Sequence, residues 1–145
     1  MTLTGTYTRT LDDKNRLAVP KRLREQLGDE DLKSLFVTPE TNHSLGLYSP
    51  EAFERFARRL EERASNSADF RNYLRLFYAR AEEVELDSQG RIRIPDRLVD
   101  FGQLKHDVVL LGVQDHAEIW DQELWNGFLD QHGPNYDEMA TRAFE

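Results

Sequence analysis

One short segment of this chain occurs twice, and the repeat constrains the fold more than any other feature of the sequence. LDDKNRLAVPKRL at residues 11–23 returns 75 residues later as LDSQGRIRIPDRL at residues 86–98. Such a repeat indicates two copies of one structural unit. A hairpin with a short helix cannot bury its apolar face alone, so we expect the copies to pack on each other, within one chain or across chains.

A tight turn is predicted at the centre of each copy. Asn15 in the first copy stands where Gly90 stands in the second, and these residue types accept a left-handed backbone most readily. We therefore expect a positive φ at both positions. Asp12 and Asp87 suit the start of such a turn, because a short carboxylate can accept hydrogen bonds from nearby backbone amides.

Each turn is followed by the pattern of a strand and then of a helix. The alternating stretches LAVP and IRIP are typical of half-buried strands. The proline that closes each stretch is expected at the first position of a short helix, at residues 21–27 and 96–101. Further strands are predicted within residues 34–39, 44–53, 106–113 and 116–125. Ser49 and Asp121 are the expected caps of the helices that follow the second and fourth of these strands.

The middle of the chain carries apolar residues at helical spacing from Phe53 to Phe77, and ASNSAD at residues 64–69 is expected to divide them into two helices. The sequence thus predicts an α+β fold with two tandem β modules packed as a pseudo-dimeric barrel. The modules are placed at residues 5–50 and 81–124. A helical linker is placed at 51–80, and a C-terminal helix with an acidic tail at 125–145.

Composition excludes several classes of protein. The chain has no cysteine, which excludes a disulfide framework and cysteine-ligated zinc. No apolar run is long enough to span a bilayer, and the N-terminal segment lacks the pattern of a signal peptide. We therefore expect a cytoplasmic protein without a membrane partner.

The charge is unevenly distributed. The net charge is −8, which by itself argues against a nucleic-acid partner. Residues 1–25, however, hold six basic side chains against three acidic ones, whereas residues 115–145 hold eight acidic groups against Arg142 alone. The first copy of the repeat is therefore a basic island in an acidic chain.

No pattern of an enzyme is present in the sequence. The four histidines are scattered without metal-ligand spacing, and neither a phosphate-binding loop nor a nucleophile elbow occurs. The acidic pair Asp12–Asp13 has no basic or nucleophilic partner specified beside it. We predict no catalytic residue, no metal site and no cofactor.

The repeat resembles the MraZ family of bacterial transcriptional regulators, whose halves are each similar to the AbrB/SpoVT swapped-hairpin DNA-binding domain. The resemblance is carried by D-x-x-x-R in both copies, at Asp12–Arg16 and Asp87–Arg91, by LTGTY near the start and by HAEIWD near the end. It covers roughly residues 1–130. Asn15 differs from the glycine that is usual at this turn position in the family, although asparagine also accepts a left-handed backbone.

The resemblance implies a ring-shaped homo-oligomer, an octamer or a dodecamer, that binds promoter DNA with direct repeats of short G-rich boxes. The genes implied are those of the division and cell-wall cluster, including the regulator's own gene. A nucleoid-associated repressor is expected. The second copy has Ser88 and Gln89 in place of Asp13 and Lys14, so the principal DNA contacts are placed in the first copy.

Guanidinium and ammonium groups suit contacts with phosphate or with the acceptors of guanine. The candidate DNA-binding residues are Lys14, Arg16, Arg22, Arg9, Lys21 and Arg91. Arg24 is expected to add sequence-independent attraction.

Another interpretation of the same residues is that Arg16 and Arg91 pair with Asp12 and Asp87 across the turns. An exposed pair of this kind contributes only about 0–1 kcal/mol, so stability alone is a weak reason to have it twice. Both interpretations can hold together, with the carboxylate orienting a guanidinium that reaches phosphate.

A non-enzymatic alternative is an antitoxin of the AbrB/MazE type, which binds a toxin protein through one segment and DNA through another. The acidic segment at residues 130–145 is a candidate for the protein-binding part. We expect the same segment to be a disordered, solvated end instead. Two copies of the fold in one chain argue against the antitoxin.

Overall fold

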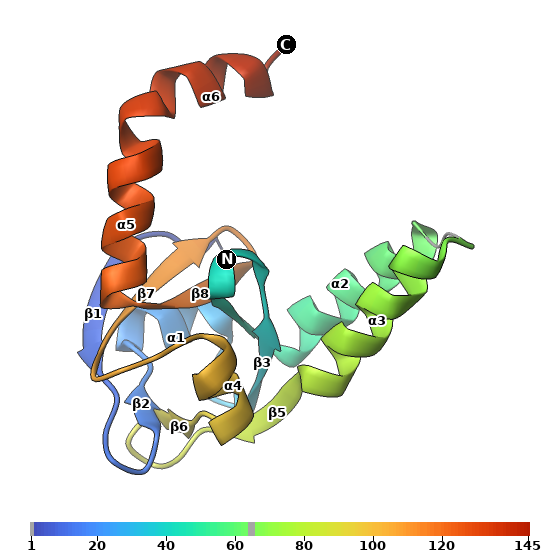
Figure 1. Ribbon diagram of the computed structural model, residues 1–145. Coiled ribbons are helices and arrows are strands. Elements are labelled where there is room, and N and C mark those ends of the chain that lie inside the picture. Colours follow the sequence, from blue (N-terminus) through green and yellow to red (C-terminus); the bar gives the residue numbers. More distant parts are fainter. Residues whose placement is uncertain (1, 64–65) are drawn as a thin grey trace.

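The two halves of the chain are interleaved in one α+β fold, in which helices flank antiparallel strands (Figure 1). The computed structural model describes residues 2–63 and 66–145. The strands are β1 (Thr6–Thr10), β2 (Arg16–Ala18), β3 (Ser34–Pro39), β4 (Leu45–Tyr48), β5 (Glu82–Glu85), β6 (Arg91–Arg93), β7 (Asp107–Val113) and β8 (His116–Asp121). The helices are α1 (Lys21–Leu27), α2 (Pro50–Glu62), α3 (Ala68–Arg80), α4 (Asp96–Phe101), α5 (Gln122–His132) and α6 (Tyr136–Ala143), with 3₁₀ turns at Thr41–His43 and Gly133–Asn135.

The predicted elements are confirmed closely. Ser49 caps α2 by accepting from the amide of Ala52, and Asp121 caps α5 by accepting from the amide of Glu123. The predicted division of the central helix is also present, although residues 64 and 65 lie outside the described residues. One detail is wrong: Pro20 and Pro95 are the caps of α1 and α4 with extended ψ, and the helices begin one residue later.

Each half contributes an outer strand to the other half. The main sheet has the order β1-β7-β8-β4-β3-β5, so β1 of the first half pairs with β7 of the second, and β5 of the second pairs with β3 of the first. The strands on either side of each turn therefore belong to different sheets. This reciprocal exchange is a swapped arrangement inside a single chain, and it is why neither copy could bury its apolar face alone.

A local twofold relation passes through the small sheet formed by β2 and β6. Leu17 pairs with Ile92, which is its own equivalent in the repeat. The flanking hydrogen bonds are also equivalent, from the Val19 amide to the Gly90 carbonyl at 3.0 Å and from the Ile94 amide to the Asn15 carbonyl at 2.8 Å. The small sheet is thus the point at which the two copies of the repeat meet directly.

The apolar core lies between the main sheet, the small sheet and the two short helices. Leu17, Leu23, Ile92, Ile94 and Leu98 are fully or almost fully buried in it. Equivalent positions of the two copies thus fill one core. Burial of side chains of this size contributes about 1.5–3 kcal/mol each, which is enough to hold the interleaved halves together.

The predicted closed barrel is not established. The hydrogen-bonded order of the main sheet ends at β1 and β5, and β2 with β6 forms a separate ladder. No helix in the described residues is long and apolar enough to cross a membrane.

Two helical projections extend from the sheet (Figure 1). The α2–α3 hairpin packs through aromatic rings, with Phe56 and Phe77 at 5.2 Å between centroids, and Phe53 stacks on Phe36 of β3 at 4.2 Å. The α5–α6 projection begins at the end of β8. The expectation of a disordered acidic end is wrong for this structure, because the chain is helical through most of residues 122–143.

We expect Gly90→Ala to destabilise the fold more than Asn15→Gly. Gly90 has φ 73°, and a Cβ there would lie 2.7 Å from Cζ of Arg24. The left-handed backbone alone costs about 1–2 kcal/mol for a residue with a Cβ. Asn15→Gly keeps the permitted backbone and is the matched control. Urea unfolding followed by circular dichroism measures the stability of both variants. Equal midpoints would contradict the requirement for a residue without a Cβ at position 90.

Candidate nucleic-acid interface

Both turns of the repeat lie at the same end of the molecule, beside the β2–β6 ladder and far from α6 (Figure 1). In the first turn, Oδ1 of Asp12 accepts from the amides of Lys14 at 2.9 Å and Arg16 at 2.8 Å. In the second, Oδ1 of Asp87 accepts from the amides of Gln89 at 2.8 Å and Arg91 at 2.9 Å. Each carboxylate thus accepts two backbone hydrogen bonds within its turn.

The same carboxylates hold the arginines of the motif. Nε of Arg16 donates to Oδ2 of Asp12 at 2.8 Å, and Nε of Arg91 donates to Oδ2 of Asp87 at 2.8 Å. The ion pairs across the turns are therefore present. Within the described residues the Nη atoms of both arginines have no partner, and about a third of each side chain is exposed. Each guanidinium is thus oriented through one nitrogen, with two nitrogens left for a ligand.

The turn geometry also changes the acidity of the carboxylates. The backbone amide of Arg16 is the largest cause that holds the pKa of Asp12 below its usual 3.8, and desolvation opposes it. The side chain of Arg16 and the amide of Lys14 lower the pKa further. The pKa of Asp87 is lowered in the same way by Arg91 and Gln89. Both groups are therefore held as anions in the folded protein.

The positive φ predicted at the turns is confirmed, with 60° at Asn15 and 73° at Gly90. Each position is then fixed by a contact to the short helix of the other half. Nδ2 of Asn15 donates to Oδ1 of Asp96 at 2.8 Å, at the start of α4. Gly90 is covered by the guanidinium of Arg24 from α1. The contacts join each turn to the opposite copy, so the two turns are held relative to each other.

Three arginines share the outer face of the β2–β6 ladder. Leu17 and Ile92 point into the core, so the residues on either side of them point outward. Arg16 lies opposite Arg93, and Ala18 lies opposite Arg91. This face, defined by Arg16, Ala18, Arg91 and Arg93, is called the arginine face below.

Sequence reasoning missed Arg93. The residue belongs to the second copy, which has fewer cations in its turn, and it stands where the first copy has Ala18. The available signal was the alternation R-I-R at residues 91–93, which puts both arginines on the side opposite a buried isoleucine. Its position across from Arg16 follows only from the register of the ladder.

The other candidates are dispersed around this face. Lys14 is exposed at the tip of the first turn, and Lys21 and Arg22 are exposed at the start of α1. Arg9 lies on β1 in the main sheet, where its Nη1 donates to the carbonyl of Thr8 at 2.7 Å. Arg24 is half-buried and donates to the carbonyl of Val19 at 3.0 Å, so part of its guanidinium is used within the fold.

A second group of titratable residues lies on the main sheet, outside the arginine face. The ring of His116 stacks on Tyr48 at 4.7 Å, and its Nδ1 is 2.8 Å from Oδ1 of Asp115. Burial lowers the pKa of His116, but hydrogen bonds to Glu118 and Asp115 outweigh burial and raise it above 6.5. Arg59 of α2 joins Asp115 at 3.1 Å, which ties the helical hairpin to the sheet. Within the described residues no group of three metal-ligating side chains is found.

Comparison with known proteins gives one consistent result. The model of a family described as "MraZ protein, putative antitoxin-like" matches the chain twice, over residues 2–76 and 77–145. A protein of Ligilactobacillus salivarius named "Transcriptional regulator MraZ" is 38% identical over 97% of this chain and 96% of its own length. Proteins of the same name from Limosilactobacillus fermentum and Alkaliphilus metalliredigens are 37% and 36% identical, over 94% and 97% of this chain and 93% and 96% of their own lengths.

We expect the carboxyl groups of Asp12 and Asp87 to titrate below 3.8 in the folded protein. Because the folded state then binds fewer protons than the unfolded state, this stabilisation is present above pH 3.8 and is lost as pH falls through the lowered values. Carboxyl ¹³C NMR gives both titrations, with Asp12→Asn and Asp87→Asn to assign the signals. A midpoint at or above 3.8 for either group would mean that the turn does not stabilise its anion.

Proposed function

Because the chain belongs to the MraZ family, we propose that it is a DNA-binding transcriptional regulator that contacts DNA through the arginine face and the two turns beside it. The observation that carries the proposal is that Nε of both motif arginines is held by a carboxylate, while their two Nη atoms have no partner among residues 2–63 and 66–145. Relatives of this chain are named transcriptional regulators. We further propose that it acts in the cytoplasm at the nucleoid, as a repressor of the division and cell-wall cluster that includes its own gene.

The shape of the arginine face supports a contact with the major groove. A two-stranded β-ribbon is narrow enough to enter that groove, where arginine can donate to O6 and N7 of guanine. Arg16, Arg91 and Arg93 stand on such a ribbon. Lys14, Lys21 and Arg22 are exposed around the first turn and α1 and suit phosphate contacts. Short G-rich boxes fit this set of donors.

The acidic net charge favours binding by several linked subunits. A subunit with a few cationic contacts binds weakly at physiological salt, since each phosphate contact is strongly salt-dependent. An oligomer that presents several arginine faces raises the effective concentration of each after the first has bound. We propose a ring-shaped homo-oligomer, an octamer or a dodecamer, on direct repeats of the box.

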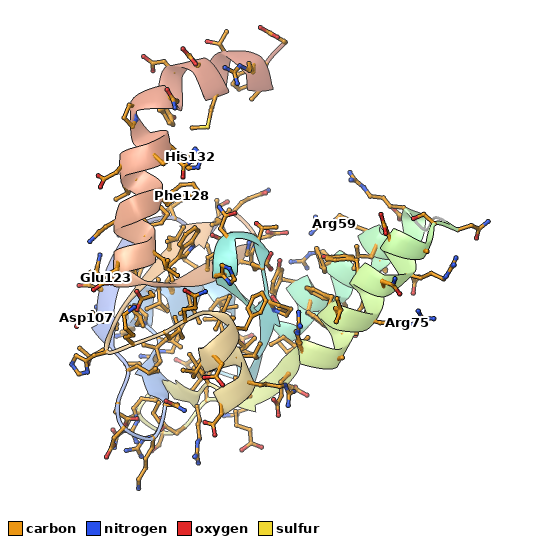
Figure 2. The ribbon with its side chains drawn as sticks, in the orientation of Figure 1. Arg59, Arg75, Asp107, Glu123, Phe128 and His132 are labelled. Carbon is orange, nitrogen blue, oxygen red and sulfur yellow. The ribbon has the colours of Figure 1, made fainter. Side chains whose placement is uncertain are left out.

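Exposed apolar side chains on the helical projections support assembly between copies. Leu76 of α3 is 53% exposed, and Tyr136 and Phe144 at the ends of α6 are 69% and 92% exposed. The α2–α3 hairpin carries exposed arginines, among them Arg59 and Arg75, which Figure 2 shows on its two helices. The segment around α6 carries exposed carboxylates. A contact between the two projections of neighbouring copies is therefore complementary in both apolar surface and charge.

One edge of the main sheet is less suited to assembly than the helices. β5, at one end of the main sheet, has the sequence EEVE, and its glutamates oppose pairing with another strand. A contact between two different surfaces, α2–α3 and α5–α6, is heterologous, and heterologous contacts close into rings when the rotation permits. The ring proposal therefore depends on the helical projections.

An antitoxin is the second candidate, favoured by the wording of the family description and by the exposed apolar residues of α6. In that case the C-terminal projection would hold a different protein. Capture of one stoichiometric toxin-like partner, with no promoter DNA bound by the free chain, would favour the antitoxin over the regulator.

We expect Arg16→Ala to weaken binding to the DNA upstream of the chain's own gene by roughly tenfold to a hundredfold, because one good base contact contributes about 1–3 kcal/mol. Footprinting on that DNA locates the boxes, and fluorescence anisotropy measures the affinity. Arg58→Ala removes a more exposed arginine on α2, away from the arginine face, and is the control for charge alone, with light scattering to verify that the assembly keeps its mass. Equal affinity of both variants and the unchanged protein would remove Arg16 from the interface.

We expect Leu76→Asp to reduce the size of the assembly, since a carboxylate would be placed on the exposed apolar side of α3. Light scattering coupled to gel filtration measures the mass. Lys33→Asp, at an exposed position in the loop between α1 and β3, makes a larger charge change at a residue that belongs to neither projection. If Leu76→Asp keeps the full mass, α3 is not part of the contact between copies.

A further inference from the structure

We propose that Arg93 is a DNA-contacting residue that sets the direction in which each subunit lies on its box. The inference rests on the proposed function, because it assumes that the arginine face meets DNA. It adds a residue outside the D-x-x-x-R motif and a reason for the subunit to recognise boxes in one orientation.

Arg93 and Arg16 occupy the closest kind of cross-strand position. The hydrogen bonds of the ladder join Val19 with Gly90 and Ile94 with Asn15, which are directly opposite pairs. Because hydrogen-bonded and non-hydrogen-bonded pairs alternate, the pair Arg16–Arg93 is non-hydrogen-bonded, with Cα atoms about 4.5 Å apart. Two guanidinium side chains therefore start side by side on the outer face.

This placement is unfavourable without an anion. Like charges directly opposite each other destabilise a ladder. Arg16 is partly compensated by Asp12, and Arg91 by Asp87. Arg93 is exposed and has no hydrogen bond or ion pair in the part of the chain that the structure describes. The three arginines are thus arranged to receive a ligand with several acceptors and negative charge, which is the chemistry of DNA.

Arg93 also breaks the local twofold relation of the face. The relation exchanges Arg16 with Arg91, and it exchanges Ala18 with Arg93. With identical residues at both places, the ribbon could enter the groove equally well in two directions. Arg93 supplies a donor on one side where Ala18 supplies none, and Lys14 against Gln89 breaks the relation in the turns. The two directions therefore differ in their contacts with an asymmetric box.

A direction of binding matters for a cyclic assembly. Copies joined by a heterologous contact all face the same way around the ring. Neighbouring subunits can then use neighbouring boxes only when the boxes are direct repeats read in the same sense. Arg93 is in this account the specificity-determining residue that makes one sense better than the other.

The test compares two DNA duplexes, one with the footprinted direct repeats and one in which every second box is inverted. The variant is Gln89→Lys with Arg93→Ala, which makes the second copy match Lys14 and Ala18 of the first and leaves the net charge unchanged. We expect the unchanged protein to bind the direct repeats about tenfold more tightly than the alternating array. We expect the variant to lose most of this preference, because the difference that remains, Lys21 against Asp96, affects phosphate contacts, which carry no sequence information.

The single change Arg93→Lys keeps the charge but removes the fork of donors, and we expect it to lower the preference for direct repeats with little effect on the salt dependence of binding. Circular dichroism verifies the fold, which is expected to persist because the side chain is exposed. A variant that keeps the full preference overturns the inference, as does an unchanged protein that binds promoter DNA without preferring direct repeats. If the unchanged protein binds no promoter DNA at all, the result contradicts the proposed function instead.

Discussion

The structure depends on the pairing of β2 with β6, in which the two copies of one sequence repeat meet at their own equivalent residues. Leu17 and Ile92 are buried opposite each other, and the hydrogen bonds beside them are related in the same way. The strand after each turn belongs to this ladder, and the strand before each turn belongs to the main sheet, where it pairs with a strand of the other half. Neither half has a complete sheet or a complete core without the other. One short ladder thus couples the stability of both copies and fixes the position of both turns.

The carboxylates of the turns are arranged so that both interpretations of the motif arginines, the ion pair and the DNA contact, can hold together. Asp12 uses one oxygen for backbone amides and the other for Nε of Arg16, and Asp87 does the same for Arg91. An exposed ion pair stabilises a protein little, but a pair built into a turn restricts the guanidinium to one direction. The side chain is then already ordered in the folded protein, so less conformational entropy is lost when a ligand binds. The ion pair is therefore compatible with the proposed DNA contact.

The uneven charge of the chain also has a structural counterpart. The arginine face and the turns lie at one end of the molecule, and the acidic C-terminal projection leaves from the other (Figure 1). On α5, the aromatic rings of Trp125, Phe128 and His132 form a continuous cluster with Trp120 of the sheet, and Figure 2 shows Phe128 and His132 near the middle and the end of the helix. The acidic residues therefore extend on an ordered helix, away from the surface proposed for DNA, where they do not cancel the local positive charge.

The sequence by itself determined the repeat, the approximate bounds of most helices and strands, the positive φ at Asn15 and Gly90, and the family. These follow from local backbone preferences and from residues that match a known pattern. The helix at residues 136–143 was missed, because the composition of a polar, acidic segment does not distinguish a helix from a disordered end. Only the tertiary structure decided that the turn-flanking strands exchange between halves, and that Arg93 lies beside Arg16. Both depend on strand register, and register is set by contacts between segments that are far apart in the chain, from 45 residues for Val37 and Glu82 to 105 residues for Thr6 and Leu111. Local patterns do not encode such contacts.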